Sequence, residues 1–308
     1  QRADLERIET MLLTVAALAA LALPQTDTTI AVRPGTRLDV NNFGGSITVK
    51  AWNQSTVRVQ ADHSSHDEIE IAAGPTVVSV RSSSRRGGPH SVDYTISVPT
   101  ATSLTLSGIY TDITVEGVGG EIDAQTVQGE IIVHGGSGNM TLKSVEGAVT
   151  LTDAKVRNVE LNTVNDNIIV SNVAGDITAE SVNGDVELTN IDASNVEATS
   201  VDGAVRYGGT IKDGGRYSLS THDGDVELGV PPTTNATVSV STFDGDFEAD
   251  FPVSVTTTKR RFTFTLGSGS ARVELESFDG NIHLRRPGQL GGSVRHRNKN
   301  HNNNEDNQ

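Results

Sequence analysis

Short runs of alternating apolar and polar residues occur along most of the chain, and tight-turn dipeptides separate them. Side chains of a β-strand point alternately to its two faces, so each run predicts a strand with one buried face. The segments 177–181 (ITAES) and 186–188 (VEL) form one such pair, with Asn183-Gly184 between them. Asn-Gly favours a sharp turn because both residues tolerate a positive φ.

This two-strand unit is repeated. The turn position recurs at residues 129, 147, 166, 184, 203, 224, 245 and 280, in steps of 18, 19, 18, 19, 21, 21 and 35. A fixed period of this length is the signature of a solenoid, a propeller or another repeat array. The copies read TVQGEIIV (126–133), SVEGAVTL (144–151), TVNDNIIV (163–170), SVNGDVEL (181–188), SVDGAVRY (200–207), THDGDVEL (221–228), TFDGDFEA (242–249) and SFDGNIHL (277–284).

The register of these copies favours parallel coils over an antiparallel meander, sandwich or barrel. Like residues recur at the same phase in five successive copies, which a coil requires because equivalent positions stack about 4.8 Å apart. We therefore predict an all-β fold, a parallel β-solenoid (β-helix) of about 19-residue coils, with around ten coils. The stacked columns are Ile122, Met140, Val159, Ile177 and Val196; Ala124, Leu142, Leu161, Ala179 and Ala198; Thr126, Ser144, Thr163, Ser181 and Ser200; Val127, Val145, Val164, Val182 and Val201; Ile131, Val149, Ile168, Val186 and Val205; and Val133, Leu151, Val170, Leu188 and Tyr207. For the Ser/Thr column we expect a structural role, either stacked hydroxyls or a bend in the coil.

The flanking segments complete the predicted organisation. Residues 27–100 contain strand-like runs without the tidy period and predict an N-terminal β section that caps the first coil. Residues 101–285 hold the solenoid repeats, with an extra strand at 262–266 and the last copy, 277–284, closing the stack. Residues 286–308 are polar and of low complexity, which predicts a disordered tail.

The N-terminus indicates export. Residues 11–23 form an uncharged apolar run, too short for a membrane helix but suited to a signal-peptide core, with Ala20-Leu-Ala22 as the cleavage pattern. We expect residues 1–22 to be a signal peptide and the mature protein to lie in the periplasm, the cell envelope or outside the cell. A buried helix is the alternative interpretation. No other segment is long enough for a transmembrane helix.

Composition and charge narrow the function. Only 35% of residues are apolar and 4% aromatic, which suits a long, thin core. The formal net charge is −15 and there is no basic stripe, so we expect no nucleic-acid partner. The acidity suits either a soluble exterior or divalent-cation binding. The absence of Cys excludes disulfides, thiolate metal sites and Cys nucleophiles.

Candidate chemistry is limited to the acidic turns. We find no catalytic motif and no His cluster with metal-ligand spacing, so we expect no catalytic residues and no cofactor. Asp223, Asp225, Asp244 and Asp246 come from two consecutive Asp-Gly-Asp turns and, if stacked, would offer four carboxylates to Ca²⁺. The calcium-binding nonapeptide pattern of β-rolls is missing, and turn formation also explains these residues. They are therefore weak calcium candidates.

The segments 92–99 (VDYTISVP), 104–106 (LTL) and 113–117 (ITVEG), followed by the repeats, resemble an uncharacterised bacterial β-strand-repeat family labelled "putative adhesin". This family is related to the head domains of autotransporter-like adhesins. The resemblance covers roughly residues 35–285, implies a β-helical fold and export to the cell envelope, and brings no catalytic residues.

These observations favour an exported, non-catalytic β-solenoid for surface adhesion, envelope structure or protein binding, with a protein or glycan at the cell surface as partner. The alternatives are a carbohydrate-active β-helix, because carboxylate pairs on such a face can cleave polysaccharides, and an envelope-stress signalling partner.

Overall fold

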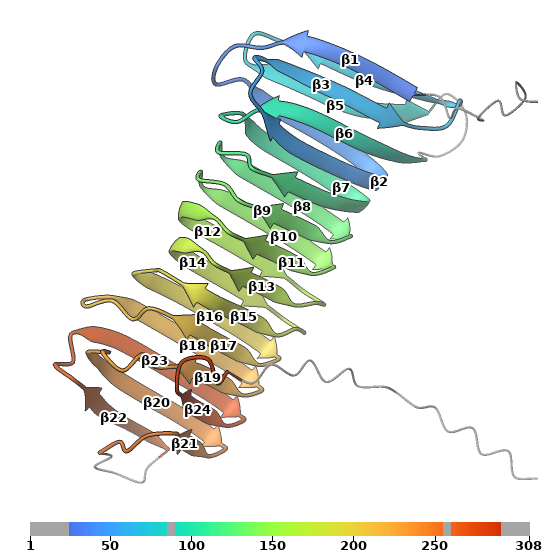
Figure 1. The fold of residues 1–308 in the computed structure, drawn as a ribbon. Coiled ribbons are helices and arrows are strands. Elements are labelled where there is room, and N and C mark those ends of the chain that lie inside the picture. Colours follow the sequence, from blue (N-terminus) through green and yellow to red (C-terminus); the bar gives the residue numbers. More distant parts are fainter. Residues whose placement is uncertain (1–24, 85–89, 255–259, 291–308) are drawn as a thin grey trace, which may run out of the picture.

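The computed structural model describes residues 25–84, 90–254 and 260–290. Within these ranges the chain forms 24 β-strands and no helix, and the strands belong to one continuous sheet. Figure 1 shows an elongated rod with β1–β6 at one end and β20–β22 at the other. The strands are β1 (Gln25–Ala31), β2 (Arg37–Trp52), β3 (Thr56–Asp62), β4 (Asp67–Ala73), β5 (Val77–Ser84), β6 (Ser91–Pro99), β7 (Ser103–Glu116), β8 (Ile122–Gln128), β9 (Ile131–His134), β10 (Met140–Glu146), β11 (Val149–Thr152), β12 (Lys155–Thr163), β13 (Ile168–Ser171), β14 (Ala174–Ser181), β15 (Val186–Ile191), β16 (Asn195–Asp202), β17 (Val205–Gly209), β18 (Arg216–Asp223), β19 (Val226–Gly229), β20 (Ala236–Asp244), β21 (Phe247–Ala249), β22 (Arg261–Leu266), β23 (Ala271–Asp279) and β24 (Ile282–Arg285).

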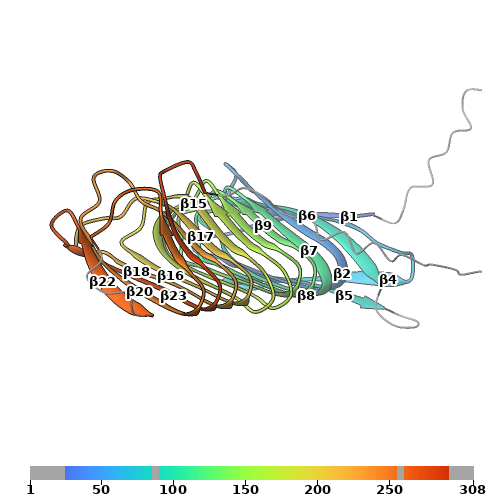
Figure 2. The same cartoon turned by 90° about the horizontal axis from the view of Figure 1, so that it is seen from below.

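Each regular coil consists of a longer strand, a tight turn and a shorter strand. In the coil of β10 and β11, Met140, Leu142, Val149 and Leu151 are buried, whereas the alternate residues Thr141 and Thr150 face outward. The longer strands form one layer, here called the long-strand face, and the shorter strands form the opposite layer, the short-strand face. The two faces meet at the turns, which line up as the turn edge. Figure 2 shows how flat each coil is.

The predicted parallel solenoid is confirmed. Equivalent residues pair in parallel between successive coils, for example Met140 with Ile122 on one side and with Val159 on the other. The stacked columns run through the registers as the sequence predicts, and the described strands make ten coils. The core is therefore a thin layer of Val, Ile, Leu and Ala that continues along the whole rod.

The Ser/Thr column stabilises the turns. Its side chains are buried, and each hydroxyl donates a hydrogen bond to a backbone carbonyl at the turn of the neighbouring coil. Ser200 donates to Gly184 over 2.8 Å, and Thr221 donates to Gly203 over 2.7 Å. Buried carbonyls need such partners, so the column has the structural role expected from the sequence.

The N-terminal end has both parallel and antiparallel pairing. Strand β2 pairs in parallel with β7 along almost its whole length, and β5 and β6 pair in parallel with its two halves. Strands β1, β3 and β4 then add antiparallel pairs that cover this end. Because β2 continues the coils, no break separates residues 27–100 from the repeats, and that domain division stays a prediction.

The C-terminal end differs from the predicted order. Strand β23 pairs in parallel with both β18 and β20, so the copy 277–284 lies between the copies 221–228 and 242–249 instead of closing the stack. Strand β22 forms the extra strand expected at 262–266 and pairs antiparallel with the outer edge of β20. The step from residue 224 to residue 245 is an ordinary 21 residues, and skipping one coil level needs only about 4.8 Å more chain. Spacing alone therefore hides the insertion.

Two predicted segments lie mainly outside the described residues. The expected signal peptide, residues 1–22, falls entirely outside them, and so do residues 291–308 of the expected tail. Residues 286–290 are described, and Leu290 lines a hollow beside Gly208 and Gly229 on the short-strand side. In the part of the chain that is described, no helix could span a membrane.

Candidate functional site

The outward side chains at the middle of the long-strand face form a regular row. From one coil to the next, a hydroxyl alternates with a carboxylate through eleven strands, and we call this the acid–hydroxyl row. In stacking order it contains Ser79, Asp39, Thr105, Asp123, Thr141, Glu160, Thr178, Glu197, Ser218, Glu274 and Ser239. Like charges directly opposite each other on neighbouring strands are destabilising, so the alternation keeps carboxylates two coils, about 9.6 Å, apart.

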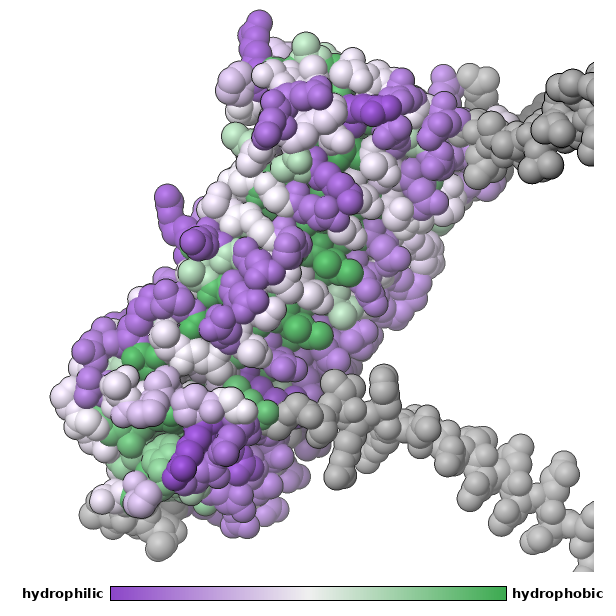
Figure 3. Space-filling model, viewed as in Figure 1, coloured by the Kyte–Doolittle hydropathy of each residue, from purple (hydrophilic) through white to green (hydrophobic). Residues whose placement is uncertain are grey.

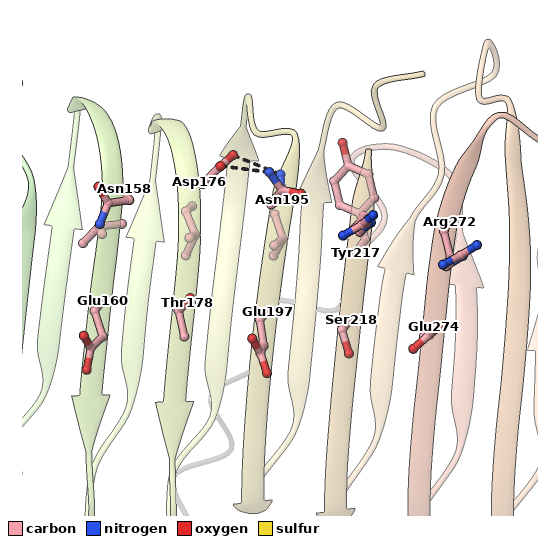
Figure 4. A pocket seen from close by; sticks show the side chains of 14 residues that line it. Asn158, Glu160, Asp176, Thr178, Asn195, Glu197, Tyr217, Ser218, Arg272 and Glu274 are labelled. Carbon is pink, nitrogen blue, oxygen red and sulfur yellow. Dashed lines mark hydrogen bonds between the residues drawn. The ribbon is translucent and has the colours of Figure 1, made fainter. Parts of the chain in front are cut away.

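A shallow groove of about 650 Å³ crosses this row on β12, β14, β16, β18 and β23. Figure 4 shows Glu160, Thr178, Glu197, Ser218 and Glu274 side by side along its floor. Carboxylates accept hydrogen bonds, whereas hydroxyls both donate and accept them. The floor therefore offers both functions in regular order to a polar ligand.

A second row borders the groove, two residues earlier on each strand. It runs through Asn158, Asp176, Asn195, Arg216 and Arg272. Asp176 accepts hydrogen bonds from the backbone N–H of Asn195 at 3.0 Å and from its amide nitrogen at 2.9 Å. Arg216 and Arg272 are neighbours in register, both are exposed, and within the described residues neither forms an ion pair. The groove thus carries charges of both signs.

Glu160 is fixed as an anion. Lys143 Nζ donates to its Oε1 over 2.7 Å, and Asn162 donates to the same oxygen over 3.0 Å. The hydrogen bond from Lys143 lowers the pKa of Glu160 more than partial burial raises it. A general acid for glycoside cleavage needs a raised pKa, so Glu160 is suited to accept hydrogen bonds and unsuited to donate a proton.

The four calcium candidates are not stacked as the sequence suggested. Their two turns are separated by the turn of Asp279 and Asn281, because β23 lies between β18 and β20. Asp225 Oδ1 accepts the backbone N–H of Asn281 over 2.8 Å, and Asn281 Oδ1 accepts that of Asp246 over 2.9 Å. These contacts tie neighbouring turns together.

The premise that Asp223, Asp225, Asp244 and Asp246 lie in adjacent turns is therefore wrong. Among the residues that the structure describes, no group of three or more His, Asp or Glu side chains could hold a metal ion. Calcium binding by this chain stays an untested prediction, and the stacking of the two turns on which it was based is not present.

A Ser, a His and an Asp do meet at the N-terminal end, but not as a catalytic relay. His90 Nδ1 lies 2.8 Å from Asp67 Oδ1 and 3.5 Å from Ser84 Oγ. A nucleophilic triad needs the acid and the nucleophile on different ring nitrogens. The Asp67 side chain is only 2% exposed, and burial alone would raise its pKa. Hydrogen bonds from His90, Ser64 and Ser84, together with the charge of His90, outweigh burial, so the pKa of Asp67 lies below its usual value.

Sequence reasoning missed the groove. Its outward residues differ in type from coil to coil, and the alternation continues beyond Ser218 only because β23 lies between β18 and β20. Most of the row could have been predicted from the central outward position of each long strand. From Thr105 to Ser218, an acid at this position in one copy alternates with a hydroxyl in the next.

One family model matches most of the chain. The profile of a family described as Toastrack DUF4097 matches residues 20–285. No curated protein matches the chain significantly. Similar solved structures include a "putative adhesin" from Bacteroides fragilis, with 13% identity and a TM-score of 0.44, covering 85% of this chain and 97% of that one. Another is a "putative lipid binding protein" from Parabacteroides distasonis, with 10% identity, a TM-score of 0.41 and the same coverage. A "putative cell adhesion protein" from Clostridium sporogenes has 10% identity and a TM-score of 0.27, covering 85% of this chain and 100% of that one. At these values the structural likenesses carry no argument about function.

Proposed function

Because the chain belongs to the Toastrack DUF4097 family, whose profile spans nearly all of its coils, we propose that it is an exported, non-catalytic binding rod that acts in surface adhesion. Its long-strand face binds a linear glycan, which lies along the acid–hydroxyl row. The groove over β12, β14, β16, β18 and β23 is the observation that carries this proposal.

The chemistry of the face favours a glycan over a protein. Protein interfaces usually have an apolar or aromatic centre, but the large exposed apolar side chains of the described residues lie on the turn edge or the short-strand face. Sugar hydroxyls both donate and accept hydrogen bonds. Glu197 supplies acceptors and Ser218 supplies a donor and acceptor on the neighbouring strand. Arg216 and Arg272 add a place for an acidic sugar.

Binding is favoured over cleavage. The acidic partner in a glycosidase must be protonated before reaction, whereas the pKa of Glu160 is lowered by Lys143. The repeating row also offers many equivalent positions instead of one unique pair of carboxylates. A linear ligand that uses several of them gains affinity from each.

Export supports the same proposal. The apolar run at 11–23 suits a signal peptide, and an exported protein has access to glycans at the cell surface. Cell fractionation with an antibody against the repeats tests this part. We expect the protein in the periplasm, the envelope or the medium, and intact protein found only in the cytoplasm would contradict it.

Glycan binding is tested by calorimetry with neutral and uronic-acid oligosaccharides of increasing length. The double variant Glu197→Gln, Ser218→Ala replaces a charged acceptor by a neutral amide and removes a hydroxyl. Each change costs about 1 kcal/mol, so we expect about 10- to 30-fold weaker binding. The matched control is Glu187→Gln, Thr150→Ala on the short-strand face, which should bind as the wild type does. No binding by any oligosaccharide, or equal losses in both variants, would contradict the proposal. Release of reducing ends would support the carbohydrate-cleaving alternative instead.

A further inference from the structure

An apolar column runs along the outside of the turn edge. The residue that follows each buried Ser/Thr, or its equivalent in the first coils, is apolar or aromatic in each of the ten described coils. It is exposed in all of them except the first, where Phe43 is half-buried and packs against Tyr110. We call this the edge column. In stacking order its residues are Phe43, Ile109, Val127, Val145, Val164, Val182, Val201, His222, Phe278 and Phe243.

Folding does not require apolar residues there. Val127, Val201 and Phe243 are 46%, 46% and 52% exposed, so much of each side chain lies in water. Figure 3 shows that most of the surface in that view is polar, with apolar side chains scattered among polar ones. The edge column is contiguous, unlike these scattered residues, and contiguous exposed apolar surface marks interaction sites.

The C-terminal part of the edge column is an aromatic stack. Phe278 lies between His222 and Phe243, and both ring-centroid distances are 4.7 Å, with interplanar angles of 16° and 2°. This stack exists because β23 is inserted between β18 and β20. The guanidinium of Arg260 lies over the free side of the Phe243 ring, 4.2 Å from its centroid. The chain itself therefore shows how this stack binds a guanidinium group.

Four carboxylates lie directly beside the aromatic stack. Asp202, Asp223, Asp279 and Asp244 occupy the next position on four consecutive coils. All four are exposed, and within the described residues none of them forms an ion pair. Like charges on adjacent strands repel each other, and the acid–hydroxyl row avoids this by alternation. At the turn edge the four carboxylates do repel each other, and a cationic partner would relieve this repulsion.

From the aromatic stack and the charge beside it, we propose that the turn edge around His222, Phe278 and Phe243 is a docking surface for an arginine-rich polypeptide segment. One guanidinium group of the segment takes the place of Arg260 on the outer face of Phe243, because both faces of Phe278 are covered by the neighbouring rings. The neighbouring carboxylates accept the N–H groups of its other arginines in pairs. Arginine is preferred over lysine because the ammonium group of lysine is compact, strongly hydrated and cannot stack. This surface lies at the edge of the rod, apart from the glycan groove.

The test measures fluorescence anisotropy of two labelled dodecapeptides, one alternating arginine with serine and the other alternating lysine with serine, against the full chain. We expect the arginine peptide to bind at least about threefold more tightly, in line with a stacking gain near 0.7 kcal/mol. The variant Phe243→Ser, Phe278→Ser keeps the net charge. It should weaken arginine-peptide binding by the same factor, about threefold, and so abolish the difference between the peptides.

Control variants separate docking from simple attraction to an acidic protein. Asp223→Asn, Asp279→Asn removes two charges beside the stack, and Glu70→Gln, Glu121→Gln removes two charges far from it. Only the first pair should weaken binding by more than about twofold. Equal losses in the two pairs, or unchanged binding after both Phe substitutions, would overturn the proposal. Thermal unfolding checks that the Phe variant is folded, and its glycan binding should match the wild type.

Discussion

Replacing Thr221 by valine tests the physical role of the buried hydroxyl column. The Thr221 side chain is 5% exposed, and its Oγ1 donates to the Gly203 carbonyl over 2.7 Å. Valine has nearly the same shape, so the substitution removes the donor without opening a cavity. The Gly203 carbonyl then loses that partner while it remains at the turn. Gly203 is half-buried, so the loss of its partner costs about 1–2 kcal/mol, and we expect Thr221→Val to lower the free energy of unfolding by that amount.

Thr221→Ser is the matched variant, because serine already occupies this column at Ser144, Ser181, Ser200 and Ser277. Serine keeps the hydroxyl and loses one methyl group, at a cost of about 0.8 kcal/mol. The hydrogen-bond account therefore predicts that the valine variant is the less stable of the two. If the column only filled space, the order would be reversed.

Urea unfolding followed by circular dichroism provides the comparison, with the slope of the transition checked for each variant. A valine variant as stable as the wild type, together with a less stable serine variant, would refute the reasoning. Ser200→Ala and Ser200→Thr repeat the test one coil away, where Ser200 Oγ donates to the Gly184 carbonyl over 2.8 Å. We expect a loss for alanine and little change for threonine.

Further predictions concern the core, the turns and the effect of pH. Leu161→Ala should lower the free energy of unfolding by about 2–5 kcal/mol, measured in urea, whereas Val164→Ala at an exposed position should cost less than about 1 kcal/mol. Gly184→Ala would place its Cβ against the backbone carbonyl of Asp166 and should reduce the melting temperature, whereas Gly229→Ala makes only ordinary contacts and should not. The pKa of Asp67 is lowered in the folded protein, so its stabilising contribution is present above the unfolded value of about 3.9 and is lost as pH falls through the folded value. Asp67→Asn should therefore be destabilising at pH 7 and approach the wild type at about pH 2; an equal difference at both pH values would contradict this.

The repeated columns made most of the fold predictable from sequence. Parallel stacking places identical chemistry at one phase, so Val149, Ile168 and Val186 identify both the coil and its register. The Ser/Thr column was predictable as structural, but its acceptors were not, because a backbone carbonyl carries no sequence signal.

The order of the last coils was not predictable, and this changed the candidate sites. The motif of residues 277–284 fits between any two coils because every coil offers the same turn and the same core positions. Sequence order therefore placed the Asp223 and Asp244 turns together, whereas Asp279 lies between them. The same insertion completes the aromatic stack around Phe278, which sequence order would leave incomplete.

The central claim is that the coils are parallel and that β23 lies between β18 and β20; both proposed binding surfaces depend on this order. Disulfide trapping at the edge column tests it most directly. The chain has no native Cys, so engineered pairs are unambiguous. A disulfide needs Cα atoms within about 7 Å, which adjacent coils at about 4.8 Å satisfy and coils two levels apart do not. We predict that His222→Cys with Phe278→Cys and Phe243→Cys with Phe278→Cys both form disulfides on mild oxidation, whereas His222→Cys with Phe243→Cys does not. Efficient cross-linking of residues 222 and 243, without cross-linking of either to residue 278, would contradict the account.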